Sequence, residues 1–242
     1  MSTDRGTITV AGIRVEVIRK DIKNLHLGVY PPNGRVRVAV PQSVSDDAAR
    51  LAVIDKLGWV KRQRAKFAEQ PRLPRPEAVT GESWYVFGQR MRLNVLPTDG
   101  QARVVRPTKG RLELHAPADM TEQARVATLD RWQRRELRRE VTALVEQWAP
   151  VVGVRPASVG IRRMRTKWGS CSTSAGHIWL NAELAKKSRS CIEYIVVHEL
   201  VHLLEPNHGE RFLALMDLHL PSWRARRDEL NRAPLAHEDW DY

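Results

Sequence analysis

Residues 198 to 208 read HELVHLLEPNH and place three histidines and two glutamates in an otherwise apolar stretch. His198 and His202 are four residues apart, so on a helix both imidazoles face the same side and can reach one metal ion. Glu199 follows the first histidine and completes an HExxH arrangement. In this arrangement a divalent ion lowers the pKa of a bound water and the glutamate accepts its proton. The stretch therefore predicts a metal-dependent hydrolase with Glu199 as the catalytic glutamate.

A third protein ligand is needed, so that one position at the metal stays open for water. His208 lies beyond Pro206, where the chain can turn back towards the ion, whereas Glu205 lies about one turn further along the same helix. We expect His208 to be the third ligand and zinc to be the metal. The spacing equals that of the metzincins, but these need glycine where this chain has Glu205, so the sequence excludes that class.

The segment around the histidines predicts a buried helix from about Cys191 to Leu204. Ser190 and Glu193 form an S-x-x-E capping pattern, and Pro206 ends the helix. Its side chains are apolar almost all round, which is typical of a helix inside a core. Stacked core histidines would satisfy the same pattern, but they leave a buried Glu199 without a purpose.

The composition of the chain bears on its cellular location and on its binding partners. The 242 residues carry a net charge of +12, with a pI near 10.3, which favours contact with polyanions such as nucleic acid, nucleotides or acidic protein, or simply a solvated basic surface. Only two cysteines are present, and neither a signal peptide nor a long apolar segment is recognisable. We therefore expect a cytoplasmic protein without a membrane-spanning segment.

The first half reads as antiparallel strands and helices in a repeated order. Alternating valines predict strands between residues 8 and 40, with a helix from Ser45 to about Gln70, and the same order recurs up to a helix that begins at Thr121. RVRVAVPQSVSDDA at 35–48 aligns without gaps on RLELHAPADMTEQA at 111–124, which is either an internal repeat or shared capping chemistry. The predicted division is residues 1–120 for the N-terminal domain and residues 121–242 for the metal-binding domain.

Three segments resemble the YgjP-like metallopeptidase family, which is related to the SprT-like and WLM zinc proteases. They read TKWGSCSTSAGHIWLNAELA at 166–185, YIVVHELVHLLEPNHGERF at 194–212 and LPSWRARRDELN at 220–231. The resemblance implies an α+β protein with a zincin-like C-terminal domain that acts on peptides or proteins. It also implies that His198, His202 and His208 bind zinc and that Glu199 is catalytic.

The segment before the histidines supplies candidate substrate contacts. Gly169 permits a tight turn, and HIWLN at 177–181 reads as an exposed edge strand on which an extended peptide could add. Basic side chains there either hold a negative oxygen in the transition state or are solvated, and the tryptophan either packs in the core or contacts substrate. The candidate contacts are Arg165, Lys167, Trp168 and Asn181.

Two other functions fit the same residues. The basic segment Arg162, Arg163, Arg165 and Lys167 suits phosphate oxygens, so the metal could serve a nucleotide pyrophosphohydrolase. Arginines on the long helix that starts near Thr121 could instead recruit the chain to DNA, with or without proteolysis there.

Overall fold

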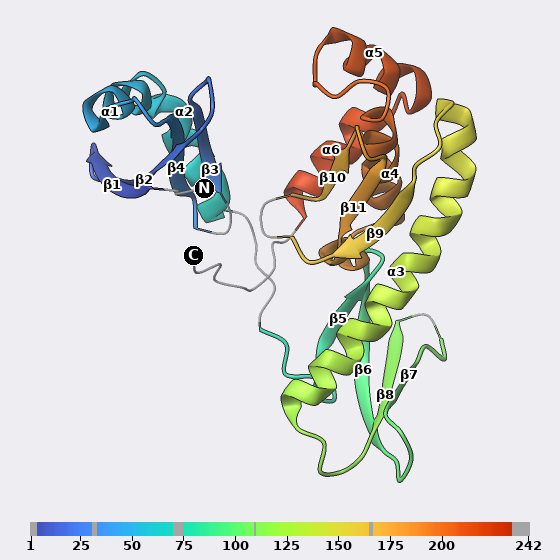
Figure 1. The fold of residues 1–242 in the computed structure, drawn as a ribbon. Helices are drawn as coiled ribbons and strands as arrows, with labels where there is room; N and C mark the ends of the chain where they lie inside the picture. Colours follow the sequence, from blue (N-terminus) through green and yellow to red (C-terminus); the bar gives the residue numbers. More distant parts are fainter. Residues whose placement is uncertain (1–3, 31–32, 70–74, 109, 165–166, 234–242) are drawn as a thin grey trace. The chain divides into compact units, whose positions relative to one another are not determined.

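The computed structural model describes residues 4–30, 33–69, 75–108, 110–164 and 167–233 (Figure 1). The chain divides into two compact units: unit 1, Met1–Pro74 with Pro234–Tyr242, and unit 2, Arg75–Ala233. This differs from the boundary that the sequence predicted at residue 120. Leu112 and Leu114, before that boundary, share one apolar cluster with Leu129 and Trp132, after it. Separating residues 1–120 from the remainder would therefore cut through a core.

Unit 1 holds one four-stranded sheet and two helices. The strand order is β1-β2-β4-β3, and β2 runs parallel to β4 while the other pairs are antiparallel. The sheet is therefore mixed rather than antiparallel as predicted, because β3 pairs on the far side of β4 and leaves β2 beside a strand of its own direction. Val15, Val17, Val36 and Val38 alternate with polar residues and form the core. The elements are β1 (Asp4–Val10), β2 (Ile13–Lys20), β3 (His26–Tyr30), β4 (Arg35–Pro41), α1 (Asp46–Asp55) and α2 (Leu57–Glu69).

Unit 2 begins with a second sheet of the same topology. Its order is β5-β6-β8-β7, with β6 parallel to β8 and antiparallel pairs outside them. The segments 35–48 and 111–124 occupy equivalent places, since β4 and β8 take the same position and a capping residue follows each. Ser45 accepts a hydrogen bond from Ala48 N, and Thr121 accepts one from Ala124 N. The strands are β5 (Ser83–Val86), β6 (Gln89–Pro97), β7 (Arg103–Val105) and β8 (Arg111–Ala116).

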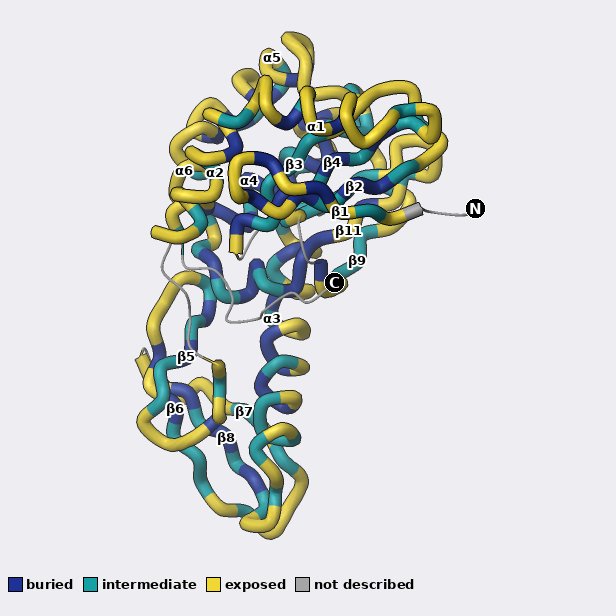
Figure 2. Tube along the Cα trace, turned by 90° about the vertical axis from the view of Figure 1, so that its left-hand side faces the viewer, coloured by how far each residue is buried: buried dark blue, intermediate teal, exposed yellow. Residues whose placement is uncertain are grey.

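Helix α3 (Glu122–Val152) connects the second sheet to the part of unit 2 that carries the histidines. Figure 2 shows its buried side turned towards β5–β8 and its other side exposed. Near its start Leu129 and Trp132 pack on that sheet, whereas Leu137 and Val141 belong to the next core. Gly153, in the left-handed conformation at φ 78°, ends the helix. One rigid element therefore joins both cores of unit 2.

The third sheet covers the helix that carries the histidines. Its order is β10-β11-β9, so residues 177–181 form the central strand, and the predicted edge strand is wrong. The edge strands are β10 and β9, because β11 uses both of its sides to pair with them. The remaining elements are β9 (Ser158–Arg162), β10 (Gly169–Ser172), β11 (His177–Asn181), η1 (Ala182–Lys186), α4 (Arg189–Val201), α5 (Glu210–His219) and α6 (Trp223–Arg232). None of the helices described in either unit has the length and hydropathy to cross a membrane.

Helix α4 is buried, as its apolar sequence predicts, but its limits differ from the prediction. Ser188 rather than Ser190 is the N-cap, since its hydroxyl accepts a hydrogen bond from Cys191 N. The helix ends at Val201 with His202 as its C-cap. Residues 202–204 form turns, so the chain leaves the helix before Pro206.

Candidate metal centre

Three histidine side chains converge on one point at the end of α4. The Nε2 atom of His208 lies 3.1 Å from the Nε2 atoms of both His198 and His202. In a tetrahedral zinc site with Zn–N bonds of about 2.0–2.1 Å, two nitrogens are roughly 3.3 Å apart. The spacing of the histidine nitrogens is close to that value, and these three residues are the group able to hold a metal ion among the described residues.

The local structure explains how the three rings meet. His198 and His202 lie on successive turns at the end of α4, and His208 returns from the loop that precedes α5. Phe212 lies in the first turn of α5 and is 2% exposed. Its ring centroid lies 4.7–4.9 Å from the centroids of all three imidazole rings. Its aromatic ring therefore forms a common apolar support behind the histidines.

Hydrogen bonding and burial prepare the imidazoles as ligands. Nδ1 of His202 lies 3.0 Å from the carbonyl oxygen of Glu205, which accepts a hydrogen bond from Nδ1–H and so leaves Nε2 with a free lone pair. Burial, with the neighbouring His202 and His208, lowers the pKa of His198 to about 3, and burial lowers the pKa of His202 as well. Neutral imidazoles are the form that binds a metal. The carboxylate of Glu205 instead accepts a hydrogen bond from Asn207 N, so Glu205 stabilises the turn after α4.

Glu199 is the other polar side chain of the site, and it is 4% exposed. Its Oε2 atom is buried without a hydrogen-bond partner in the described residues, which is costly unless another group arrives. Burial raises the pKa of Glu199 to about 8, against the lowering effect of Lys167. A buried carboxyl group of this kind beside three converging histidines fits a bound cation and its water.

Gly169 makes room for that carboxylate. A Cβ atom added at this position would lie 2.7 Å from Cγ and Cδ of Glu199, inside van der Waals contact. The backbone at Gly169 is an ordinary strand that pairs with Leu180, so the turn expected from the sequence is not what requires glycine. The missing side chain lets the edge strand β10 lie directly against the glutamate.

A cleft of about 540 Å³ opens onto the histidines and Glu199. Helix α4 contributes one part of its lining, β10 with its preceding residues a second, and α6 a third. Lys167 and Trp168, two of the candidate substrate contacts, line it. Trp168 also packs against the core beside the ammonium of Lys187, 5.4 Å from the ring centroid. Arg165 lies outside the described residues.

Asn181 does not take part in the cleft. Its side chain is 3% exposed, and its amide donates to the carbonyl oxygens of Met164 and Lys167 at 2.7 and 2.8 Å. Its Oδ1 atom accepts a hydrogen bond from Glu183 N. The residue therefore holds both ends of the segment before β10, a structural role that keeps Lys167 in place. A polar residue at the end of a strand fits either role, and the sequence alone could not separate them.

Tyr194 and Arg227 are among the cleft residues that the sequence analysis did not single out. Tyr194, one turn before His198, lines the cleft, and burial raises the pKa of its phenol. Its position four residues before a ligand is a signal that could have been used. Arg227 of α6 also lines the cleft, but nothing in its local sequence distinguishes it from the other arginines of that helix.

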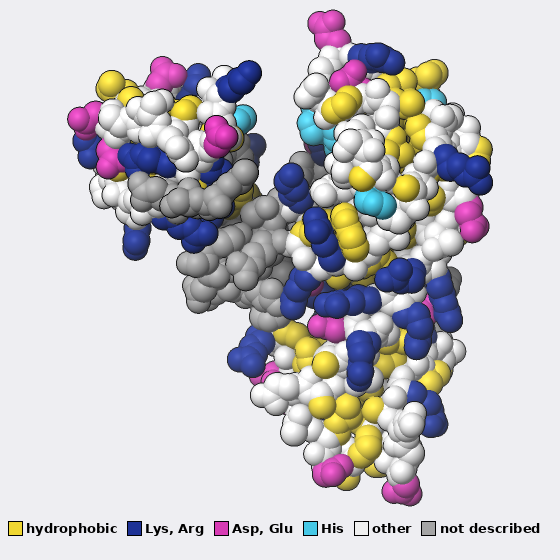
Figure 3. All heavy atoms as spheres, viewed as in Figure 1, with side chains coloured by type: hydrophobic (Ala, Val, Ile, Leu, Met, Phe, Trp, Pro, Cys, Tyr) yellow, Lys and Arg dark blue, Asp and Glu magenta, His cyan; other side chains and the backbone are white. Residues whose placement is uncertain are grey.

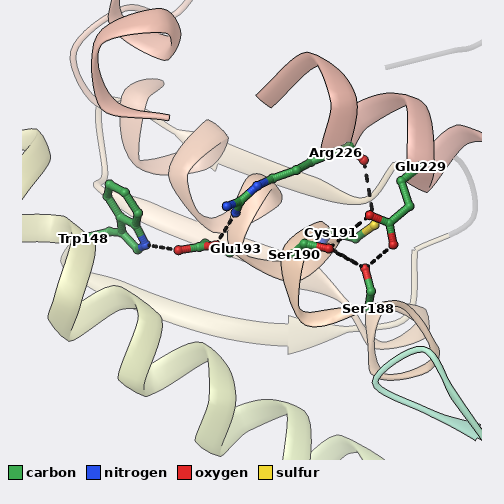
Figure 4. A network of polar contacts seen from close by, with 7 residues as sticks. All are labelled: Trp148, Ser188, Ser190, Cys191, Glu193, Arg226 and Glu229. Atoms are coloured by element: carbon green, nitrogen blue, oxygen red, sulfur yellow. Dashed lines mark hydrogen bonds and ion pairs between the residues drawn. The ribbon is translucent and has the colours of Figure 1, made fainter. Parts of the chain in front are cut away.

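The start of α4 is fixed by polar contacts from two other helices (Figure 4). The Glu229 carboxylate of α6 accepts from the hydroxyls of Ser188 and Ser190, at 2.5 and 3.1 Å. Glu193 accepts from the indole nitrogen of Trp148 at 2.9 Å and also pairs with Arg226. The predicted capping partner Glu193 therefore connects α4 to α3 and α6.

The fold and the site define a class before any relative is considered. Three converging histidines and a buried glutamate at an open cleft, in a mixed α+β protein, make a metallohydrolase. The family model described as YgjP-like, metallopeptidase domain matches residues 23–233, and the chain belongs to that family. The protein is accordingly a metallopeptidase by family, and membership implies a divalent metal and peptide or protein substrates.

Two solved structures are similar to parts of the chain. The metallopeptidase zymogen of Pyrococcus abyssi abylysin shares 23% identity at a TM-score of 0.35, covering 39% of this chain and 99% of that one. The zymogen of Methanocaldococcus jannaschii jannalysin shares 18% identity at a TM-score of 0.32, covering 37% of this chain and 95% of that one. No curated protein matches the chain.

Proposed function

We propose that this protein is a zinc-dependent peptidase of the cytoplasm, with its catalytic site in unit 2. The observation that carries the proposal is the meeting of three Nε2 atoms with the unpartnered oxygen of Glu199 beside a strand with an open edge. Imidazole nitrogens in this number are typical zinc ligands and leave one position for water. Both cysteines are free thiols, in agreement with a reducing compartment.

In this proposal His198, His202 and His208 hold the zinc ion. A zinc ion held by three imidazoles supplies Lewis-acid activation of water at neutral pH. Glu199 would accept a proton at Oε2 from the attacking water and pass it to the leaving amine. Lys167, whose charge acts on Glu199, stabilises the negative oxygen that develops on the scissile carbonyl.

The free edge of β10 is the proposed site for the substrate backbone. Gly169, Ser170 and Cys171 line the cleft, and within the described part of the chain their strand pairs on one side only, with β11. An extended peptide can add there as a further strand, which places its backbone next to Glu199. We also propose that the sheet β10-β11-β9 above α4 is a zincin-like arrangement.

The nucleotide pyrophosphohydrolase predicted from sequence depends on a basic segment, 162–167, in which Arg162 and Arg163 have partners here. The guanidinium of Arg162 lies 5.1 Å from the ring centroid of Trp179, and Arg163 is 3.7 Å from a carboxylate oxygen of Glu183. Lys167 is thus the one described member of that segment that lines the cleft. Lys and Arg side chains do spread over the face of unit 2 seen in Figure 3, so nucleotide hydrolysis and DNA association stay predictions.

Metal content tests the proposal first. Protein purified without a metal-affinity tag is measured by elemental mass spectrometry, with His208→Ala as the test and His219→Ala of α5 as the matched control. We expect about one zinc per chain in the wild type and the control, and its loss in His208→Ala. Zinc-loaded protein is then offered unfolded protein substrates and, separately, nucleoside triphosphates. Release of pyrophosphate without peptide cleavage would contradict the peptidase assignment and favour a nucleotide pyrophosphohydrolase.

A further inference from the structure

The cleft is lined by one cation to which the proposed reaction gives no role. Apart from the three histidines and Glu199, the charged side chains lining it in the described part of the chain are Lys167 and Arg227. Both are cations and they come from different elements, the segment before β10 and helix α6. A divalent ion adds further positive charge, so the filled site attracts anionic substrate groups.

The two cations differ in their relation to the reacting centre. Lys167 acts electrostatically on Glu199 and on His202, which places it near the atoms that react. The charge of Arg227 acts instead on Tyr194, one turn earlier on α4 than the first ligand. Arg227 enters the cleft from α6 beside Trp223, whose ring stacks on Tyr194, so its place in the cleft suits contact with a substrate side chain rather than with the carbonyl under attack.

Neighbouring groups fix the guanidinium of Arg227 in position. It lies 5.1 Å from the ring centroid of Trp223, and that ring stacks on Tyr194 with 6.3 Å between centroids. Nε and Nη2 donate to Oδ1 of Asp228 at 3.3 and 3.2 Å. Nη1 is left without a hydrogen-bond partner in the described residues. A held guanidinium with free donors is suited to bind a carboxylate.

We propose that Arg227 is a specificity-determining residue that favours polypeptides carrying an acidic side chain close to the scissile bond. The inference rests on the proposed peptidase function and names the substrate class of the same site. Arg224 shows that stacking on Trp223 does not by itself create such a subsite. It lies 4.5 Å from the same ring centroid, but Asp217 binds both of its terminal nitrogens, and Arg224 does not line the cleft.

The test compares peptides that differ at one position, with Glu, Gln or Lys placed in turn at each site around one cleavable bond. Wild type, Arg227→Gln, Arg227→Glu and the matched control Arg224→Gln are assayed as full-length, zinc-loaded proteins. At one position we expect wild type and the control to cleave the Glu peptide with a kcat/KM about tenfold above the Gln peptide. Arg227→Gln should remove this preference, and Arg227→Glu should transfer it to the Lys peptide.

Inversion of the preference is a result that a purely structural role of Arg227 does not produce. Peptide affinity, measured by fluorescence anisotropy in a Glu199→Gln background that does not turn over, gives a second readout, and Arg227→Lys tests whether charge alone suffices. Cleavage with equal kcat/KM for Glu, Gln and Lys at every position overturns the inference and leaves the peptidase assignment intact. If no peptide is cleaved, the assignment itself fails, and equal affinities for the three peptides then overturn the inference as well.

Discussion

The polar side chains at the two ends of helix α4 differ in whether they have partners for their hydrogen bonds. At the first end Ser188, Ser190 and Glu193 all have partners, which are Glu229, Trp148 and Arg226 (Figure 4). At the last end His198 and His202 turn Nε2 lone pairs towards His208, and Glu199 keeps a buried oxygen with no partner among the described residues. The polar side chains at the start of α4 therefore have hydrogen-bond partners, whereas the buried Oε2 atom of Glu199 near its end has none among the described residues.

Buried polar groups in proteins are normally paired, so a group of them left unpaired together indicates a ligand. The start of α4 gains stability from its contacts, since each one joins it to α3 or α6. The side chains at the end of α4 lower the stability of the fold, because Glu199 and His198 are removed from water. A bound cation would compensate this cost. Changing residues at the two ends should therefore affect different properties.

The largest expected effect is on turnover, after Glu199→Gln. The amide keeps the size of the side chain but cannot accept the proton of water, so we expect kcat to fall by about a thousandfold or more. Zinc should remain bound, because the histidines are unchanged, and metal analysis of the same sample checks this. Peptide hydrolysis at the wild-type rate by purified Glu199→Gln contradicts the role of the glutamate.

The second prediction concerns the space beside that carboxylate. In Gly169→Ala the new methyl group would lie 2.7 Å from Cδ of Glu199, so either the glutamate or β10 must move. We expect kcat/KM to fall by about a hundredfold, because displacement of a catalytic group by about 1 Å has that cost. Gly6→Ala, in strand β1 with no atom nearer than 3.8 Å to its Cβ, is the matched control. Equal activity in both variants removes the steric role of Gly169.

Much of the fold follows from local patterns in the sequence. The alternating valines of β2 and β4 form the buried faces of their strands, and Ser45 and Thr121 cap the helices that they were expected to begin. The parallel pairing of β2 with β4 was not predicted, because it depends on which edge of β4 the intervening strand β3 occupies. That choice is made by packing between distant segments and leaves no local signal.

The candidate site divides in the same manner. His198 and His202 are brought together by helical spacing alone, and a single turn returns His208, so all three were predictable. Gly169 and Arg227 reach the site from β10 and α6 through tertiary structure. Their roles depend on distances to α4 that the sequence does not contain.

The third prediction concerns how much the buried Glu199 carboxylate lowers the free energy of unfolding of the metal-free protein. The folded pKa of Glu199 is about 8 against an ordinary value of 4.5, so between these limits the folded chain holds a proton that the unfolded chain has lost. Stability of the wild type therefore decreases as pH rises through this window. Glu199→Gln does not titrate, so its stability advantage should grow from near zero at pH 4 to about 5 kcal/mol above pH 8.

Urea unfolding with a chelator present, followed through the tryptophans of unit 2, measures this difference at several pH values. Adding zinc should reduce it, because the ion compensates the charge of Glu199. An advantage that is the same at pH 4 and pH 8.5 shows that the carboxylate is not desolvated in the folded chain.

The smallest expected effect lies at the satisfied end, after Glu229→Gln. Hydrogen bonds from Ser188 lower the pKa of Glu229 below 4.5 despite partial burial, so its contribution is present at neutral pH and disappears as pH falls through the folded value. Because the side chain is exposed, we expect a loss of only about 1 kcal/mol at pH 7, and less below pH 4. Glu146→Gln on α3 is the control. Peptidase activity should stay within about twofold of wild type, since α4 keeps its remaining anchors to α3 and α6. A large loss of activity without loss of stability would mean that the start of the helix also sets the geometry of the metal site.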